Sequence, residues 1–150
     1  MTVRKRFDRE LYNANDDAKL LVMAHLGGDW AVGADRYGPD LHSAASDSWA
    51  EVEVKKHWVT PPSFPYQTLQ IPGRKMRYIT DANGKMRDID FWILSADRSH
   101  ALVVKGHQVL SSPLVIVPNK YIGYGEKFFQ VPIELCKVVQ IQISDSAQRS

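Results

Sequence analysis

The stretch Trp49-Ala-Glu-Val-Glu-Val-Lys-Lys-His-Trp58 decides the fold that this sequence predicts. From Glu51 to Lys55, charged and apolar residues alternate strictly, which is the period of a β-strand with two different faces. The two valines share one face, whereas Glu51, Glu53 and Lys55 share the other. We therefore expect a strand that buries one face in a core and presents three charges together on its second face.

The residues before this strand predict a long amphipathic helix over 7–26. Its apolar stripe recurs at helical spacing, and Gly27-Gly28 ends it, because glycine is favoured just after a helix. The stripe consists of Phe7, Leu11, Ala14, Ala18, Leu21, Val22 and His25. Glu10 and Asp17 each follow a stripe position by three residues, so both are expected at the seam between the helix and the body of the protein.

The rest of the chain predicts further strands and one short helix. Pro72 can open a helix through residues 74–79, since proline is favoured in the first turn. Strands are expected at 30–37, 88–94, 101–104 and 114–117, an irregular connector at 60–65, a loop at 42–48 and a turn at 81–84. The strands 88–94 and 101–104 are expected to form a hairpin, and the apolar segments 128–131 and 135–143 have no pattern that determines their type. This order indicates an α+β domain over 1–143 around one sheet, with a frayed tail at 144–150.

The composition is ordinary for a soluble globular protein, with 44% hydrophobic and 24% charged residues. A net charge of +2 permits nucleic-acid binding without arguing for it. Cys136 is the only cysteine, which excludes an intramolecular disulfide and a cysteine-based zinc site. No apolar run is long enough to cross a membrane. No apolar segment follows the basic start, so we expect no signal peptide. We expect a cytoplasmic protein, located in the host cytoplasm if a phage encodes it.

Two carboxylates and a lysine form the constellation that carries chemistry. Asp40 is expected at the end of the strand 30–37 and Glu53 on the next strand, so that a hairpin brings them side by side. Mg²⁺ prefers oxygen ligands, usually one or two carboxylates with water and substrate phosphate. Asp40 and Glu53 are therefore candidate metal ligands, with the carbonyl of Val54 as another. Lys55 can position the attacking water and stabilise charge that develops on the phosphate.

This pattern resembles the PD-(D/E)XK nuclease superfamily, which includes many restriction enzymes, Holliday-junction resolvases and phage nucleases. It stands here as Pro39-Asp40, twelve intervening residues and Glu53-Val54-Lys55, and the resemblance covers roughly residues 7 to 80. It implies a restriction-endonuclease-like mixed sheet flanked by helices. The implied activity is endonuclease or exonuclease hydrolysis of DNA with Mg²⁺, for which Mn²⁺ can substitute. It also implies a catalytic glutamate on the first helix, for which Glu10 is the natural match and Asp17 the reserve.

Simpler interpretations remain open at this point. Glu51, Glu53 and Lys55 are also what the solvated face of an edge strand carries, where charge discourages aggregation. On that interpretation the chain is a non-catalytic nucleic-acid-binding protein or a phage structural protein with the same fold. Glu51 itself is either a second metal ligand or, as we expect, an outer charge.

A basic rim beside the site would contact DNA phosphates without reading sequence. Its candidates are Lys56, His57, Arg74, Lys75 and Arg77. The alternative for the last three is a plain solvated helix face. For a duplex substrate we expect a homodimer, because one chain offers one such constellation for one strand. Residues 135–143 are the expected contact surface, or alternatively an internal strand.

Overall fold

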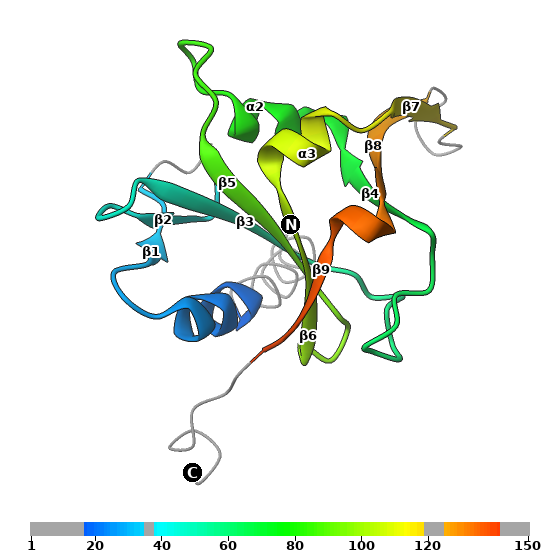
Figure 1. The fold of residues 1–150 in the computed structure, drawn as a ribbon, viewed down its shortest axis with the longest axis horizontal. Helices are drawn as coiled ribbons and strands as arrows, with labels where there is room; N and C mark the ends of the chain where they lie inside the picture. The colour runs from blue at the N-terminus through cyan, green and yellow to red at the C-terminus, as the bar shows by residue number, and fades with distance from the viewer. Residues whose placement is uncertain (1–16, 35–37, 119–124, 142–150) are drawn as a thin grey trace, which may run out of the picture.

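A computed structural model describes residues 17–34, 38–118 and 125–141 of the chain, and in these it has two sheets (Figure 1). The larger sheet has the spatial order β1 (Ala31–Val32), β2 (Leu41–Ser43), β3 (Ser48–Val54), β5 (Asp88–Leu94), β6 (His100–Lys105) and β9 (Lys137–Gln140). The smaller sheet has the order β4 (Thr68–Pro72), β8 (Glu126–Pro132) and β7 (Leu114–Val117). The short helices are η1 (Gly73–Lys75), α2 (Met76–Ile79), α3 (Gly106–Leu110) and η2 (Ile133–Leu135), and a further helix occupies residues 17–26.

Strand direction makes the larger sheet mixed. β3 and β5 run parallel over their whole length, from Ser48 opposite Asp88 to Val54 opposite Leu94. All the other strand pairs in the described residues are antiparallel. The expected α+β class is therefore confirmed, with a sheet that is mostly antiparallel.

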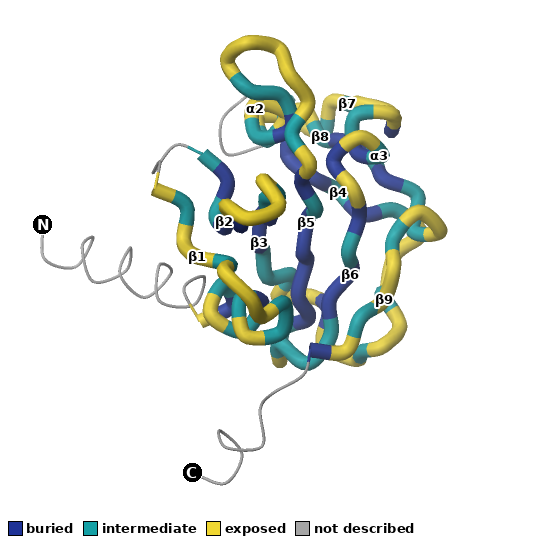
Figure 2. Tube along the Cα trace, turned by 60° about the vertical axis from the view of Figure 1, so that its left-hand side comes forward, coloured by how far each residue is buried: buried dark blue, intermediate teal, exposed yellow. Residues whose placement is uncertain are grey.

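Both faces of the larger sheet are covered, and each has its own hydrophobic core. On one face, Ala18 and Val22 of the helix 17–26 are fully buried against Val52 and Leu94. On the other face, the smaller sheet and the helices α2 and α3 pack over Phe91 and its neighbours. Figure 2 shows the buried positions running along the central strands, with more exposure at the edges. One helix therefore covers the first face, and a second sheet with two short helices covers the other. The restriction-endonuclease-like arrangement stays a prediction.

Several expected elements are confirmed with little change. The strands 88–94 and 114–117 have the expected bounds, and β5 pairs with β6 as a hairpin. The helix ends at residue 26, and the N–H of Gly27 donates to the carbonyl of Met23 at 2.9 Å. Gly27 has φ +69°, the left-handed conformation that favours glycine after a helix.

Other expectations about local structure were wrong. The strand expected at 30–37 is limited to Ala31–Val32 in the described part of the chain, where residues 35–37 are not included. β2 extends into the start of the expected loop 42–48, because His42 and Ser43 pair with β3. The short helix expected through 74–79 is present as η1 and α2, but Pro72 is the last residue of β4 and the N-cap of η1, so the first helical residue is Gly73. β4 itself and α3 were not expected.

The segment 135–143 is part core and part edge. β9 lies at one end of the six-stranded order and pairs only with β6 in the described residues. Val138 is 51% exposed, whereas Val139 packs into the core and Ile141 is buried. Residues 142–143 and the tail 144–150 lie outside the described residues, and the homodimer stays a prediction. None of the described helices is of sufficient length and apolarity to span a bilayer.

We expect Gly106→Ala to lower the free energy of unfolding by about 1–3 kcal/mol, which is typical of overpacked cores. Gly106 is buried at the start of α3, where a Cβ would lie 2.5 Å from Cγ2 of Ile89 and 3.3 Å from its carbonyl oxygen. The stiff β-branched isoleucine cannot turn away easily. Urea denaturation measures the change, and an unaltered midpoint would contradict this packing.

Candidate functional site

The β2–β3 hairpin places Asp40 beside the middle of β3. Leu41 is opposite Ala50, so the preceding residue, Asp40, lies next to Glu51 and Val52. Its Oδ2 accepts the backbone N–H of Val52 at 2.9 Å, and its own N–H donates to Oε1 of Glu51 at 3.1 Å. The carboxylate of Asp40 thus accepts a backbone N–H of β3 that an adjacent strand would otherwise bind. Asp40 directly precedes the strand β2, whereas we expected it at the end of a strand over 30–37. It nevertheless lies beside β3, as expected.

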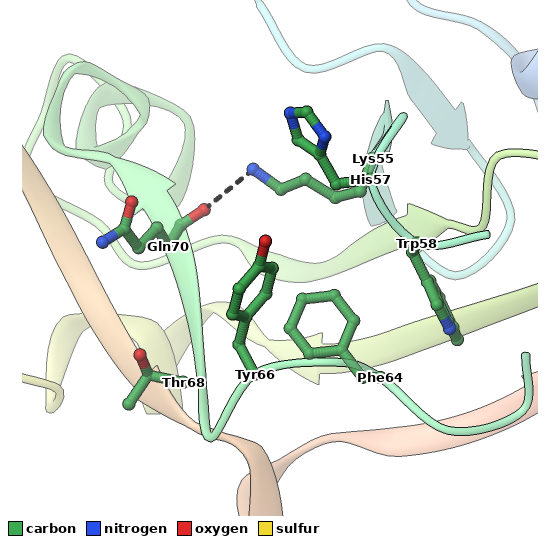
Figure 3. Close-up of a pocket in the computed structure, with 7 residues that line it drawn as sticks. All are labelled: Lys55, His57, Trp58, Phe64, Tyr66, Thr68 and Gln70. Atoms are coloured by element: carbon green, nitrogen blue, oxygen red, sulfur yellow. Dashed lines mark hydrogen bonds between the residues drawn. The ribbon is translucent and has the colours of Figure 1, made fainter. Parts of the chain in front are cut away.

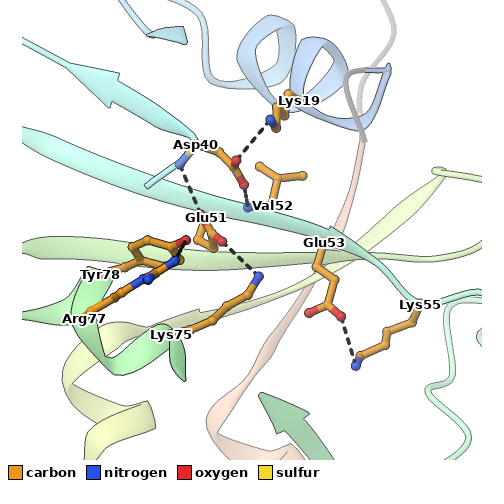
Figure 4. A network of polar contacts seen from close by, with 9 residues as sticks. All are labelled: Lys19, Asp40, Glu51, Val52, Glu53, Lys55, Lys75, Arg77 and Tyr78. Atoms are coloured by element: carbon orange, nitrogen blue, oxygen red, sulfur yellow. Dashed lines mark hydrogen bonds and ion pairs between the residues drawn. The ribbon is translucent and has the colours of Figure 1, made fainter. Parts of the chain in front are cut away.

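Three carboxylates and three lysines meet here, and each lysine comes from a different segment (Figure 4). We call this set the acid–lysine cluster; its ion pairs are Lys19 Nζ–Asp40 Oδ1 at 3.1 Å, Lys75 Nζ–Glu51 Oε2 at 2.9 Å and Lys55 Nζ–Glu53 Oε1 at 3.3 Å. Lys19 belongs to the helix 17–26, Lys55 follows β3, and Lys75 ends η1. Segments far apart in the sequence therefore assemble one charged site.

Glu51 is buried, and both of its carboxylate oxygens are engaged. Its side chain is 7% exposed, with one oxygen on the N–H of Asp40 and the other on Lys75. Burial raises the pKa of Glu51 to about 7, although the ammonium of Lys75 opposes the shift. Glu51 is therefore not the outer charge expected from the sequence. It holds the backbone of Asp40 in place.

Lys75 belongs to the interior of this site and not to its rim. Its side chain is 12% exposed. Burial lowers its pKa, but the carboxylates of Glu51 and Glu53 outweigh burial, and the net shift of the Lys75 pKa is upward. Lys75 is therefore not part of the exposed basic rim that the sequence predicts.

The remaining rim candidates are exposed. Lys56 and His57 come directly after Lys55 and are exposed. Arg74 pairs with Glu126 at 3.4 Å, and a guanidinium nitrogen of Arg77 donates to the hydroxyl of Tyr78 at 3.1 Å. These contacts leave four basic side chains at the surface on the segments that flank the cluster.

The two carboxylate oxygens of Glu53 have different environments. Its Oε1 pairs with Lys55, whereas its Oε2 is buried and has no hydrogen-bond partner among the described residues. Lys55 also donates to the carbonyl of Gln70 in β4 at 3.3 Å, which holds the ammonium beside the carboxylate. The expected placement of Glu53 and Lys55 on one face is confirmed by their ion pair. A buried carboxylate oxygen without a donor is costly unless a proton or a cation reaches it.

The acidic residue expected from the first helix is not part of the described site. Glu10 lies outside the described residues. Asp17, the reserve, has a 63% exposed side chain and lies 3.6 Å from Nε of Arg98, so it does not contact the cluster. Lys19 is the residue of this helix that reaches Asp40, and no spacing in the sequence indicates it.

Asp40, Glu53 and the carbonyl of Val54 are the metal ligands that the sequence predicts. In the described ranges no group of three or more His, Cys, Asp or Glu side chains is arranged to hold a metal. Mg²⁺ typically takes only one or two protein carboxylates and keeps several waters. Asp40 has both carboxylate oxygens engaged, by Lys19 and by the N–H of Val52, whereas Glu53 has one oxygen without a partner in the described chain, and Val54 follows it as the last residue of β3. Figure 4 shows the two carboxylates pointing in different directions from β3, Asp40 toward Lys19 and Glu53 toward Lys55. Their sharing of one metal therefore stays a prediction.

The other acidic pair, Asp88 and Asp90, has separate partners. Asp88 accepts the hydroxyl of Ser48 at 2.8 Å, and Asp90 lies 3.8 Å from Lys105. Neither residue belongs to the acid–lysine cluster.

No protein-family model matches this sequence, and no curated protein matches it either. A proposal for function therefore depends on the chemistry of the cluster itself.

Proposed function

We propose that this protein is a metal-dependent nuclease that hydrolyses DNA phosphodiester bonds, with Asp40 and Glu53 as the ligands of Mg²⁺. The observation that carries the proposal is the buried Oε2 of Glu53, which lacks a hydrogen-bond partner in the described chain while its other oxygen touches Lys55. A cation at that oxygen would satisfy it. Asp40 directly precedes β2, and two hydrogen bonds hold it beside β3: its N–H donates to Glu51, and its carboxylate accepts the N–H of Val52.

Each residue of the cluster has a role in this chemistry. Asp40 and Glu53 would hold the metal, with the carbonyl of Val54 as a further ligand, and Mg²⁺ supplies Lewis acidity to the phosphate when bound. Lys55 would orient the attacking water and stabilise negative charge that develops on the phosphate. Glu51 positions Asp40 through its backbone N–H. Mn²⁺ would serve in place of Mg²⁺, since both accept carboxylate and water ligands.

The partner that fits these features is DNA. Lys56 and His57 lie two residues or fewer beyond Lys55 and are exposed, so they can contact phosphates on either side of the scissile one. Arg74 and Arg77 extend this basic rim from η1 and α2. Such contacts supply affinity without sequence information.

A second candidate is a non-catalytic DNA-binding protein, and the three ion pairs favour it. Lys19, Lys55 and Lys75 each balance one carboxylate, so the cluster is neutral without any metal. On this proposal the cluster only joins the helix, the hairpin and η1, and the basic rim alone has a function.

Cleavage of a panel of DNA substrates separates the two candidates. Supercoiled plasmid, nicked duplex and branched oligonucleotides are incubated with the purified chain in Mg²⁺, in Mn²⁺ and in EDTA. The nuclease proposal expects metal-dependent products from at least one substrate. Intact DNA throughout, in a preparation that binds the same DNA in EDTA, would favour the non-catalytic candidate.

Metal binding itself gives a further prediction. At a hundredfold excess over its Kd, Mg²⁺ should stabilise the fold by about 2.7 kcal/mol through mass action. Glu53→Gln should remove most of this gain, because a neutral amide is a poorer ligand. Glu134→Gln is the matched control, since Glu134 is an exposed glutamate of η2. Thermal melts with and without Mg²⁺ measure the shift, and equal shifts in the wild type and Glu53→Gln would exclude Glu53 as a ligand.

A further inference from the structure

A cavity of about 300 Å³ lies directly beside Lys55 (Figure 3). The lining residues that matter here are Lys55, His57, Trp58, Phe64, Tyr66 and Gln70. We call it the aromatic pocket. Its volume is at the low end of the range for ligand sites, about 300–1,000 Å³. It shares Lys55 with the acid–lysine cluster, so a molecule in the pocket would lie next to any group held by the cluster.

The aromatic side chains form a ladder that is rigid at its base and open at its end. Trp58 is fully buried, and its indole N–H donates to the carbonyl of Ser63 at 2.9 Å. Phe64 packs edge-to-face on Trp58, with ring centroids 5.5 Å apart at 82°. Tyr66 packs edge-to-face on Phe64 at 5.7 Å and 71°. The ring of Tyr66 is thus held by its neighbours while the residue is 58% exposed.

The basic side chains of the pocket, Lys55 and His57, lie on one side of it, and Lys55 is also paired with Glu53 at 3.3 Å. Figure 3 shows the ammonium of Lys55 and the ring of His57 on one side, with the hydroxyl of Tyr66 directed toward Lys55 and Phe64 further away. Lys55 is tied to the carbonyl of Gln70 across the pocket at 3.3 Å. A matching ligand therefore has a flat apolar part for the rings and an anionic part for the Lys55 side. A nucleotide has this combination, with its base joined through a sugar to a phosphate.

Pairing and stacking decide which nucleotides can enter. Inside a continuous duplex, both faces of a base are covered by its neighbours, so an aromatic side chain cannot stack on it without extruding it. A base in a single strand, a flap or a junction has a free face, and aromatic stacking is a common way to hold it.

We propose that the aromatic pocket binds an unpaired nucleobase through Tyr66 and Phe64, next to the phosphate that Lys55 contacts. The inference rests on the proposed nuclease function for its phosphate, and it assigns the substrate class as DNA with single-stranded or branched character. Tyr66 is the residue that sets this preference, because it is the exposed ring of the ladder.

Binding measured without metal tests the pocket separately from catalysis. Fluorescence anisotropy in EDTA follows a dye-labelled oligothymidine and, in parallel, a blunt duplex of the same length. Tyr66→Ala should weaken binding of the single strand roughly tenfold or more, which corresponds to losing one stacked base. Duplex affinity should stay unchanged. Tyr66→Phe should keep the wild-type affinity, since it keeps the ring.

Val59→Ala is the matched control, because Val59 is 66% exposed, lies near the pocket in sequence and does not line it. Thermal melts confirm that each variant folds. Equal single-strand affinity in Tyr66→Ala and the wild type would overturn the proposal, as would an equal loss for duplex or no single-strand binding by the wild type. Selective loss of single-strand binding, in a protein that cuts no DNA, would support the pocket and reject the nuclease. Metal-dependent cleavage that Tyr66→Ala leaves unchanged would support the nuclease and reject the pocket.

Discussion

Replacing Lys55 with alanine is expected to reduce the rate of DNA cleavage by roughly a hundredfold to ten-thousandfold, the usual cost of losing a positioned acid–base group. The ammonium of Lys55 lies 3.3 Å from Oε1 of Glu53 and is held by the carbonyl of Gln70 at the same distance. No other lysine of the described chain is in contact with Glu53 at ion-pair distance. The loss should therefore appear in the catalytic step, measured as initial rates at saturating DNA in Mg²⁺.

Asp40→Asn should have a comparable effect by weakening the metal site. The asparagine keeps an oxygen for the N–H of Val52 at 2.9 Å, so the hairpin should stay folded while the negative charge is lost. Controls are Lys85→Ala and Asp47→Asn, two exposed residues outside the acid–lysine cluster and the basic rim. Full activity in Lys55→Ala or Asp40→Asn, with both controls also active, would show that cleavage does not use this cluster.

Lys75→Met should cost about 3–5 kcal/mol of stability at pH 8, the usual penalty for removing one partner of a buried ion pair. Lys75 and Glu51 are 12% and 7% exposed and lie 2.9 Å apart. Without the ammonium, the carboxylate of Glu51 would be buried without a cationic partner at that distance. Methionine preserves most of the length of the side chain and lacks only the terminal ammonium, so the cost reports mainly the lost charge.

The penalty should depend on pH in a defined direction. Burial raises the pKa of Glu51 from 4.5 to about 7, so the folded state holds this proton more tightly than the unfolded state. The stability that Glu51 contributes in this way is present below pH 4.5 and is lost as the pH rises through about 7. Removing Lys75 takes away an influence that lowers this pKa, which moves the loss to higher pH and enlarges it. Lys75→Met should therefore cost little at pH 5 and most at pH 8.

Urea denaturation at both pH values measures this difference. The double variant Glu51→Gln/Lys75→Met should recover much of the stability at pH 8, because glutamine can still accept the N–H of Asp40 and carries no charge. Lys137→Met, at an exposed lysine of β9, is the matched control. A cost that is equal at pH 5 and pH 8, or a double variant no better than the single one, would contradict the coupling of these two side chains.

The local pattern of the sequence was sufficient for part of the fold and part of the site. Alternation between Glu51 and Lys55 predicted a strand with Glu53 and Lys55 on one face, and their ion pair confirms it. The apolar run 88–94 predicted the strand β5, and Gly27-Gly28 predicted the end of the first helix. Each of these features depends on side chains a few residues apart, where backbone geometry alone determines which ones are neighbours.

Only the tertiary structure decided the rest of the site. Asp40 and Lys75 reach β3 from two other segments, and Lys19 reaches Asp40 from a third; their spacing in the sequence does not predict these contacts. The burial of Glu51 depends on the same assembly, because its face of β3 is covered by chain that follows more than a dozen residues later. In the same way β4 became a strand only by pairing with β8, some sixty residues away. A short segment of sequence indicates the propensity of its own residues. Which strand it pairs with, and which charged side chain it meets, depends on how the whole core packs.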